Sequence, residues 1–245
     1  MFPKLKLGPT SRPGLWLCVV VANLLLWPSL ATGQAAHVYI TQNGAGLKDG
    51  SSLANAGACD ATPNTPQATC AFFNNAANWG AGAAQIGAGT IVHLSGIINA
   101  AQSGSASYLQ FQGSGAAGTP ITLLFDADAV LQSPAFWVAI NINSQSYITV
   151  DGGANGIIQN TANGTSRTYH QSSQGIHVSG AYYTEIKNLA IKDIYLNGGN
   201  VNTATDTAGA GTQNIRVDGA NGSLSIHHNT LSAARTGWTW PFPPA

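Results

Sequence analysis

A short phrase is repeated three times between Ala139 and Ala234, and it constrains the fold more than any other feature. Each copy has two short apolar segments: 140–142 with 146–152, 176–178 with 183–188, and 215–217 with 223–229. The isoleucines that open the copies, Ile140, Ile176 and Ile215, lie 36 and 39 residues apart. Repeats of roughly this length are typical of proteins in which one small structural unit stacks on the next.

The composition favours strands as the repeated unit. Only 7% of the 245 residues are charged, 29 are Gly, and short β-branched runs alternate with Gly, Asn and Ser. Strands so short bury a face only if each turn of the chain pairs in parallel with the one below, about 4.8 Å away. The sequence therefore predicts an all-β fold, a right-handed parallel β-helix, over residues 89–236.

Side-chain alternation along the strands predicts which residues face outward. Three strands are expected in each copy, and Ile176 and Val178 should point inward while His177 points outward. Asn188 and Asn229 fall at turns, where their amides are expected to form a ladder along the stack. The same register predicts three outward columns: Asn141, His177 and Arg216; Asn143, Ser179 and Asp218; and Asp151, Lys187 and His227.

Residues 1–35 resemble an export signal. Lys4, Lys6 and Arg12 precede an apolar run from Leu15 to Trp27, and small residues follow it. A membrane-spanning helix needs about 20 apolar residues, so a membrane anchor is the less favoured alternative. We expect a secreted, extracellular, periplasmic or cell-surface protein with no membrane span once the signal is removed.

Residues 36–88 are expected to hold a first strand, a disulfide loop and a cap. Export favours a disulfide between Cys59 and Cys70, with two buried free thiols as the alternative. Apolar residues at helical spacing in 71–80 predict a short N-terminal capping helix, since the end of a stack of strands must be covered.

Two long insertions, 159–174 and 192–213, are expected at the same corner of successive turns, where they would form one wall of a groove. The tail, 237–245, is rich in Pro and aromatic residues and has no strand pattern. It is expected to be either a cap on the last turn or the end of a truncated stack.

Three phrases, at 38–56, 148–153 and 226–231, resemble exported right-handed parallel β-helix proteins of the pectate-lyase-like superfamily. The resemblance covers about residues 36–236. It implies a carbohydrate-facing protein, since many relatives are polysaccharide lyases, glycoside hydrolases or epimerases. The paired-aspartate motif of the polygalacturonases is not matched.

The outward columns supply the candidate catalytic residues, Arg216, Asp218 and His177. A lyase needs a base and a cation, commonly Ca²⁺, beside a uronate carboxylate. Ordinary ion pairing between neighbouring strands explains the same residues without catalysis. A hydrolase needs two carboxylates at a fixed separation, for which Asp126 and Asp128 are the candidates.

Aromatic and cationic side chains supply the candidate substrate-binding residues Tyr169, Tyr183 and Lys187, although such aromatic residues often serve packing instead. We expect a monomeric secreted protein that binds an acidic polysaccharide. If it is an enzyme, it is expected to cleave that polysaccharide as a lyase or glycoside hydrolase. The alternative is a non-catalytic surface, adhesion or structural module. The sequence has no basic stripe of the kind that indicates a nucleic-acid partner. It does not identify metal ligands.

Overall fold

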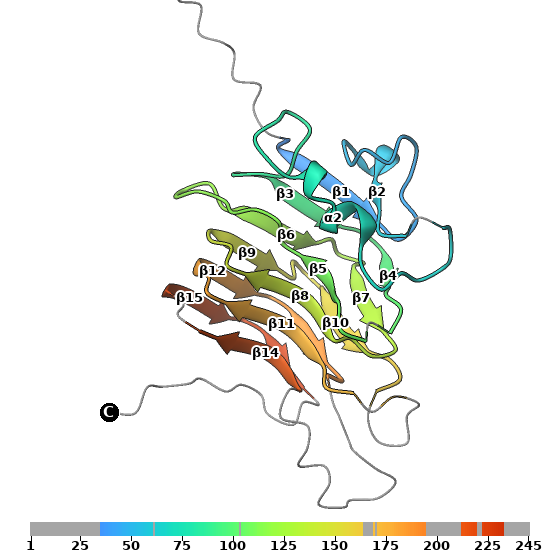
Figure 1. Ribbon diagram of the computed structural model, residues 1–245, viewed down its shortest axis with the longest axis vertical. Coiled ribbons are helices and arrows are strands. Elements are labelled where there is room, and N and C mark those ends of the chain that lie inside the picture. Colours follow the sequence, from blue (N-terminus) through green and yellow to red (C-terminus); the bar gives the residue numbers. More distant parts are fainter. Residues whose placement is uncertain are drawn as a thin grey trace, which may run out of the picture. The chain divides into compact units, whose positions relative to one another are not determined.

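The computed structural model describes residues 35–60, 62–102, 104–163, 169, 171–194, 212–219 and 222–232. All of them belong to one compact unit, Gly33–Ala245. These residues are nearly all β, and their strands form parallel sheets (Figure 1). In the part of the chain that is described, no helix is long and apolar enough to cross a membrane.

The strands form three sheets, and every pair of neighbouring strands is parallel. The seven-stranded sheet has the order β15 (Gly222–His227), β12 (Tyr182–Lys187), β9 (Ile148–Asp151), β6 (Ile121–Phe125), β3 (Ile91–Leu94), β1 (His37–Thr41) and β2 (Gly57–Ala58). The five-stranded sheet has the order β16 (Thr230–Leu231), β13 (Ala190–Lys192), β10 (Ile157–Asn160), β7 (Val130–Ser133) and β4 (Ile97–Asn99). The four-stranded sheet has the order β14 (Gln213–Asp218), β11 (Gln174–Ser179), β8 (Val138–Asn143) and β5 (Ser107–Gln110).

From β4 onward the chain visits the sheets in a fixed cycle. It runs from the five-stranded sheet to the four-stranded sheet, then to the seven-stranded sheet, and then begins again. Each circuit, here called a pass, adds one strand to every sheet, so a strand pairs with the strand three places before or after it. The three strands expected in each repeat are therefore confirmed, and this connectivity is compatible with the predicted β-helix.

Apolar side chains of successive passes stack in the interior. Ile176 pairs with Ile140 on one side and with Ile215 on the other, and all three are almost completely buried. The next inward column, Ile142, Val178 and Val217, is buried as well. Burying such a side chain contributes about 1.5 to 3 kcal/mol, which explains why the interior columns determine the register.

Residues with positive φ form the corner between the four-stranded and seven-stranded sheets. Gly180 and Gly219, which follow the paired residues Ser179 and Asp218, have φ angles of 62° and 72°. The second bend at this corner uses non-glycine residues, Tyr147 and Tyr183, with φ angles of 56° and 55°. At the last three of these corners two left-handed residues turn the chain from one sheet into the next: Ser144 and Tyr147, Gly180 and Tyr183, and Gly219 and Ser223.

The predicted asparagine ladder takes a different form. The Asn229 amide accepts a hydrogen bond from the Leu189 backbone N–H and donates one to the Ile186 carbonyl, each at 2.9 Å. Asn188 instead donates to Asp151 at 2.9 Å. Both amides connect neighbouring passes, but their partners are backbone groups and a carboxylate rather than other asparagine amides.

The expected helix in 71–80 is shorter than predicted. The chain forms a single helical turn, α2 (Ala71–Asn74), and a 3₁₀ turn, η2 (Ala76–Asn78); another 3₁₀ turn, η1 (Leu53–Asn55), precedes them. Asn75 interrupts the helix with an extended backbone, and its side chain accepts a hydrogen bond from the Ala77 N–H. Because Asn75 caps the second turn, a continuous helix cannot pass through it.

Aromatic packing and a disulfide hold this N-terminal part together. Phe73 is buried, and its ring meets the edges of Trp79 and Phe111 with centroids 4.9 and 5.2 Å apart. The disulfide predicted between Cys59 and Cys70 is present. Closing so short a loop contributes on the order of 2 to 3 kcal/mol by restricting the unfolded chain.

The ends of the two long insertions join the same two sheets. One insertion connects β10 to β11 and the other connects β13 to β14, so both lead from the five-stranded to the four-stranded sheet. The expectation that they share a corner is consistent with this connectivity. Residues 164–168 and 195–211 of the insertions, the export signal apart from Ala35, and the tail from 237 to 245 lie outside the described residues.

Candidate functional site

The three predicted catalytic residues come together on the outer face of the four-stranded sheet. His177 on β11 pairs in register with Arg216 on β14, and Ser179 pairs with Asp218, as the sequence predicted. The Nε2 atom of His177 lies 3.1 Å from Oδ2 of Asp218, and Nε of Arg216 lies 2.5 Å from the same oxygen. We call these three residues the His177 cluster.

Burial determines the protonation of this cluster. The pKa of His177 is lowered, chiefly because burial disfavours the charged imidazole; the hydrogen bond and the charge of Asp218 oppose that effect, while the Arg216 charge adds to it. When the neutral ring donates its Nε2–H to Asp218, Nδ1 carries the lone pair. The cluster therefore presents a neutral base beside a fixed guanidinium.

A second group of polar and aromatic side chains covers the outer face of the seven-stranded sheet. Its residues alternate with the buried ones on β9, β12 and β15 and align across the three strands. We call this group the outer grid; it consists of Tyr147, Thr149 and Asp151, then Tyr183, Glu185 and Lys187, then Ser223, Ser225 and His227. The predicted column of Asp151, Lys187 and His227 is confirmed as one of its edges.

Glu185 is the centre of the ionic part of the grid. It contacts Nζ of Lys187 at 2.9 Å and Nε2 of His227 at 3.0 Å, while Lys187 also lies 3.8 Å from Asp151. Lys187 and then His227 lower the pKa of Glu185, and Glu185 in turn raises the pKa of Lys187. Both groups therefore remain charged over a wide pH range, so Glu185 does not resemble a general acid, whose pKa would be raised.

The aromatic part of the grid is a pair of stacked rings. Tyr147 and Tyr183 have ring centroids 4.6 Å apart and ring planes 8° from parallel. Both residues have positive φ, which is strained for a bulky side chain, and Tyr183 is 54% exposed. Tyr147 is half-buried, and strain at two aligned tyrosines that both reach the surface motivates a functional hypothesis.

The structure separates the predicted substrate-binding residues. Tyr183 and Lys187 belong to the same strand of the outer grid. Tyr169 lies instead in the connection between β10 and β11, where it forms an isolated bridge with Asn163. Tyr183 and Lys187 therefore share one strand, Tyr169 belongs to another part of the chain, and substrate binding by the three stays a prediction.

Among the grid residues that carry an aromatic ring or an ionisable group, sequence reasoning missed Tyr147 and Glu185. Glu185 lies two residues after Tyr183 and two before Lys187, so strand alternation places all three on one face. Tyr147 precedes β9 by one residue and aligns with Tyr183 through the pairing of Ile148 with Thr184. Aligning the repeats could therefore have identified both Tyr147 and Glu185.

Asp126 and Asp128 do not form a carboxylate pair on one strand. β6 ends at Phe125, and both aspartates follow it in a turn. Asp126 bonds to Nδ1 of His93 at 2.8 Å, whereas Asp128 accepts a bond from the Gly96 N–H at 3.3 Å. Because each serves a different partner, the hydrolase hypothesis for this pair is not supported.

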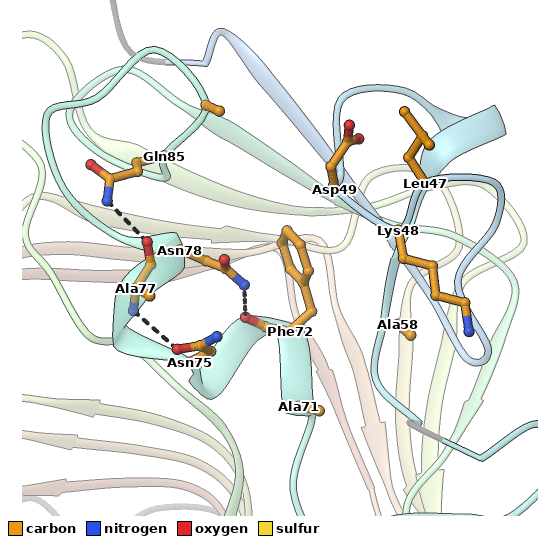
Figure 2. Close-up of a pocket in the computed structure, with 11 residues that line it drawn as sticks. Leu47, Lys48, Asp49, Ala58, Ala71, Phe72, Asn75, Ala77, Asn78 and Gln85 are labelled. Carbon is orange, nitrogen blue, oxygen red and sulfur yellow. Dashed lines mark hydrogen bonds between the residues drawn. The ribbon is translucent and has the colours of Figure 1, made fainter.

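A hollow of about 600 Å³ lies elsewhere, between α2, η2 and the loop at 47–49 (Figure 2). Its polar side chains bond within the protein: Asn78 donates to the Phe72 carbonyl and Gln85 donates to the Ala77 carbonyl. The ring of Phe72 lies against Gly57, where a Cβ would come within 2.4 Å of Cγ. The hollow contains neither the His177 cluster nor the grid, so its lining indicates packing rather than chemistry.

Metal-binding side chains are sparse. Among the described residues, no three or more His, Cys, Asp or Glu side chains group in a way that could hold a metal ion. The Ca²⁺ that a lyase would need therefore has no candidate ligand group of this kind among those residues. Comparisons with protein-family models, with curated proteins and with solved structures found no match to this chain.

Proposed function

We propose that this chain is an exported right-handed parallel β-helix whose outer grid binds a polysaccharide. The cyclic path through three parallel sheets supports the β-helix, since each pass would be one turn of the coil. The disulfide supports export. α2 and η2, with Phe73 and Trp79 packed beneath them, serve as the cap at the N-terminal end of this stack.

The observation that carries the proposal is the stacked pair Tyr147 and Tyr183 beside the fixed charges of Glu185 and Lys187. A sugar ring has an apolar face and a rim of hydroxyl groups. The exposed ring of Tyr183 and the half-buried ring of Tyr147 match the apolar face, and charged side chains held in place form strong hydrogen bonds to the rim. Neighbouring strands repeat such positions at about 4.8 Å, which suits an extended chain of sugars.

The charge pattern favours hydroxyl-rich sugars as well as uronates. Lys187 already contacts two carboxylates, so a uronate would have to compete with Glu185 and Asp151 for it. Arg216 likewise contacts Asp218. The proposed ligand class is therefore polysaccharide in general, and acidic polysaccharides form one arm of the test.

A second candidate function is cleavage of a uronate polysaccharide by elimination, carried by the neutral His177 held by Asp218 beside Arg216. In this reaction His177 takes the proton next to the uronate carboxylate while Arg216 balances the developing negative charge. The carbon–oxygen bond to the leaving sugar breaks, a carbon–carbon double bond forms, and the leaving oxygen receives a proton from the imidazolium. Accumulation of unsaturated products, followed by ultraviolet absorbance, tests it against a His177→Ala variant.

Binding is tested by electrophoresis of the purified protein through gels that contain neutral or uronate polysaccharides, with and without Ca²⁺. We expect retardation in at least one gel, and loss of that retardation in the Tyr147→Ala, Tyr183→Ala double variant. Trp137→Ala is the matched control, because Trp137 is also partly exposed but lies in the connection between β7 and β8. Unchanged migration of the wild-type protein in every gel contradicts the proposal, and so does retardation that the double variant retains.

A further inference from the structure

Two histidines meet on the same outer face, on strands that β6 separates from the grid. His37 on β1 and His93 on β3 both point outward, because they alternate with the buried Val38 and Val92. The two strands are direct neighbours in the seven-stranded sheet (Figure 1). Nδ1 of His37 lies 3.0 Å from Nε2 of His93.

His93 is held on two further sides. Its Nδ1 lies 2.8 Å from Oδ1 of Asp126, and the other oxygen of Asp126 accepts a bond from the Ser95 hydroxyl. The ring also stacks on Tyr39, with centroids 4.5 Å apart and planes 13° from parallel. The side chain of His93 is only 15% exposed, so both its position and its tautomer are fixed.

This fixed tautomer directs a lone pair outward. When the Nδ1–H of a neutral His93 ring donates to Asp126, its Nε2 carries the lone pair and can accept a hydrogen bond from Nδ1–H of His37. Two nitrogens that bind one tetrahedral Zn²⁺ at about 2.0 to 2.1 Å are roughly 3.3 Å apart. The observed separation of 3.0 Å is that of a hydrogen bond, so an ion can enter only when the exposed ring of His37 turns out of that bond and directs its Nδ1 lone pair at the ion instead.

We propose that His37 and His93 bind a divalent transition-metal ion such as Zn²⁺, with Asp126 orienting His93 and water completing the coordination. A carboxylate behind a ligating imidazole is the usual arrangement in metal sites, because it fixes the ring and raises its basicity. Imidazole suits Zn²⁺, Cu²⁺ and Ni²⁺ rather than Ca²⁺.

A second pair of histidines provides an internal comparison. His227 and His228 place their Nδ1 atoms 2.6 Å apart, because His228 turns the chain with a φ of 55°. That separation is too short for two nitrogens on one ion without rearrangement. We therefore expect the first equivalent of metal to bind at His37 and His93.

The site is tested by adding one equivalent of ZnCl₂ to ¹⁵N-labelled protein and recording the ring-nitrogen resonances of the histidines. We expect Nδ1 of His37 and Nε2 of His93 to shift while the His177 ring does not. His37→Ala and His93→Ala should each lower the Zn²⁺ affinity at least tenfold, and Asp126→Asn should lower it about 10- to 100-fold. His228→Ala is the matched control and should leave the affinity of the first site unchanged.

Two results overturn the inference. One is unchanged His37 and His93 resonances in excess ZnCl₂, including the case in which only His227 and His228 respond. The other is a His37→Ala variant that keeps the wild-type affinity; since His37 is exposed, a circular dichroism spectrum shows whether the variant is folded. Polysaccharide binding by the outer grid involves different residues, so failure of either proposal leaves the other standing.

Discussion

The His177 cluster and the outer grid lie on different sheets of the same passes. They differ in the protonation of their ionisable side chains. In the cluster, one carboxylate serves both an imidazole and a guanidinium, and burial keeps the imidazole neutral. In the grid, Glu185 and Lys187 shift each other's pKa toward the charged forms. The cluster thus retains a group that can take a proton, whereas the grid holds permanent ions beside aromatic rings.

The difference shows that faces formed by the same stacked strands can hold either a neutral imidazole or a network of charged side chains. A neutral base is useful only if a proton is to be moved. Fixed ions and stacked rings provide binding without any reaction.

The largest effect is expected from the core beneath both faces. Ile176 lies beside His177 on β11, and Ile186 lies between Glu185 and Lys187 on β12; both are completely buried. Ile176→Ala and Ile186→Ala should each lower the free energy of unfolding by about 2 to 5 kcal/mol. Chemical denaturation measures both, and a loss well below 1 kcal/mol in either would mean that the two faces do not share one interior.

A smaller effect is expected at the corner between the two sheets. If the positive φ of Tyr183 is strained, Tyr183→Gly should be more stable than Tyr183→Ala by about 1 kcal/mol, because only Gly adopts this conformation freely. Gly180→Ala at the preceding bend should be destabilising by a similar amount. Equal stability of the two Tyr183 variants would mean that the backbone of Tyr183 is not strained.

The ionic part of the grid predicts a change in titration. In Lys187→Met the pKa of Glu185 should rise toward its ordinary value of 4.5, because Lys187 is the main cause of its lowering. In the wild type, the stability due to this ion pair is present above about pH 4.5 and is lost as the pH falls through the lowered pKa. Carboxyl-carbon NMR measures the shift; Lys48→Met is the control, and an unchanged Glu185 pKa in Lys187→Met refutes the network.

The smallest effect concerns the pH dependence of stability that arises from His177. Its folded pKa lies below the ordinary 6.5, so the unfolded chain binds the proton more readily. The free energy of unfolding should therefore decrease as the pH falls below about 6.5, and less so in His177→Gln. Denaturation at pH 5 and pH 8 compares the two proteins, and an equal or steeper decrease in the variant would show that His177 is not held neutral by burial.

The register was predictable because the inward columns repeat. Ile140, Ile176 and Ile215 open three similar phrases, and aligning them placed His177 beside Arg216 correctly. The disulfide was predictable as well, since Cys59 and Cys70 are the two cysteines that follow the expected export signal.

Other contacts had no periodic signal. His37 and His93 are 56 residues apart because the disulfide loop and α2 lie between their strands, so the repeat length does not align them. The left-handed bends at Tyr147 and Tyr183 were not predictable from residue type, since tyrosine rarely adopts positive φ. The helix expected in 71–80 was too long because apolar spacing does not reveal that Asn75 caps a separate turn.

The central claim, that the outer grid binds polysaccharide, is tested most directly by NMR of the aromatic rings during titration with the polysaccharide that retards the protein most. The account predicts that the ring signals of Tyr147 and Tyr183 shift together and in proportion to bound ligand, while those of Trp137 stay in place. Saturable binding that leaves both tyrosine rings unperturbed would contradict it.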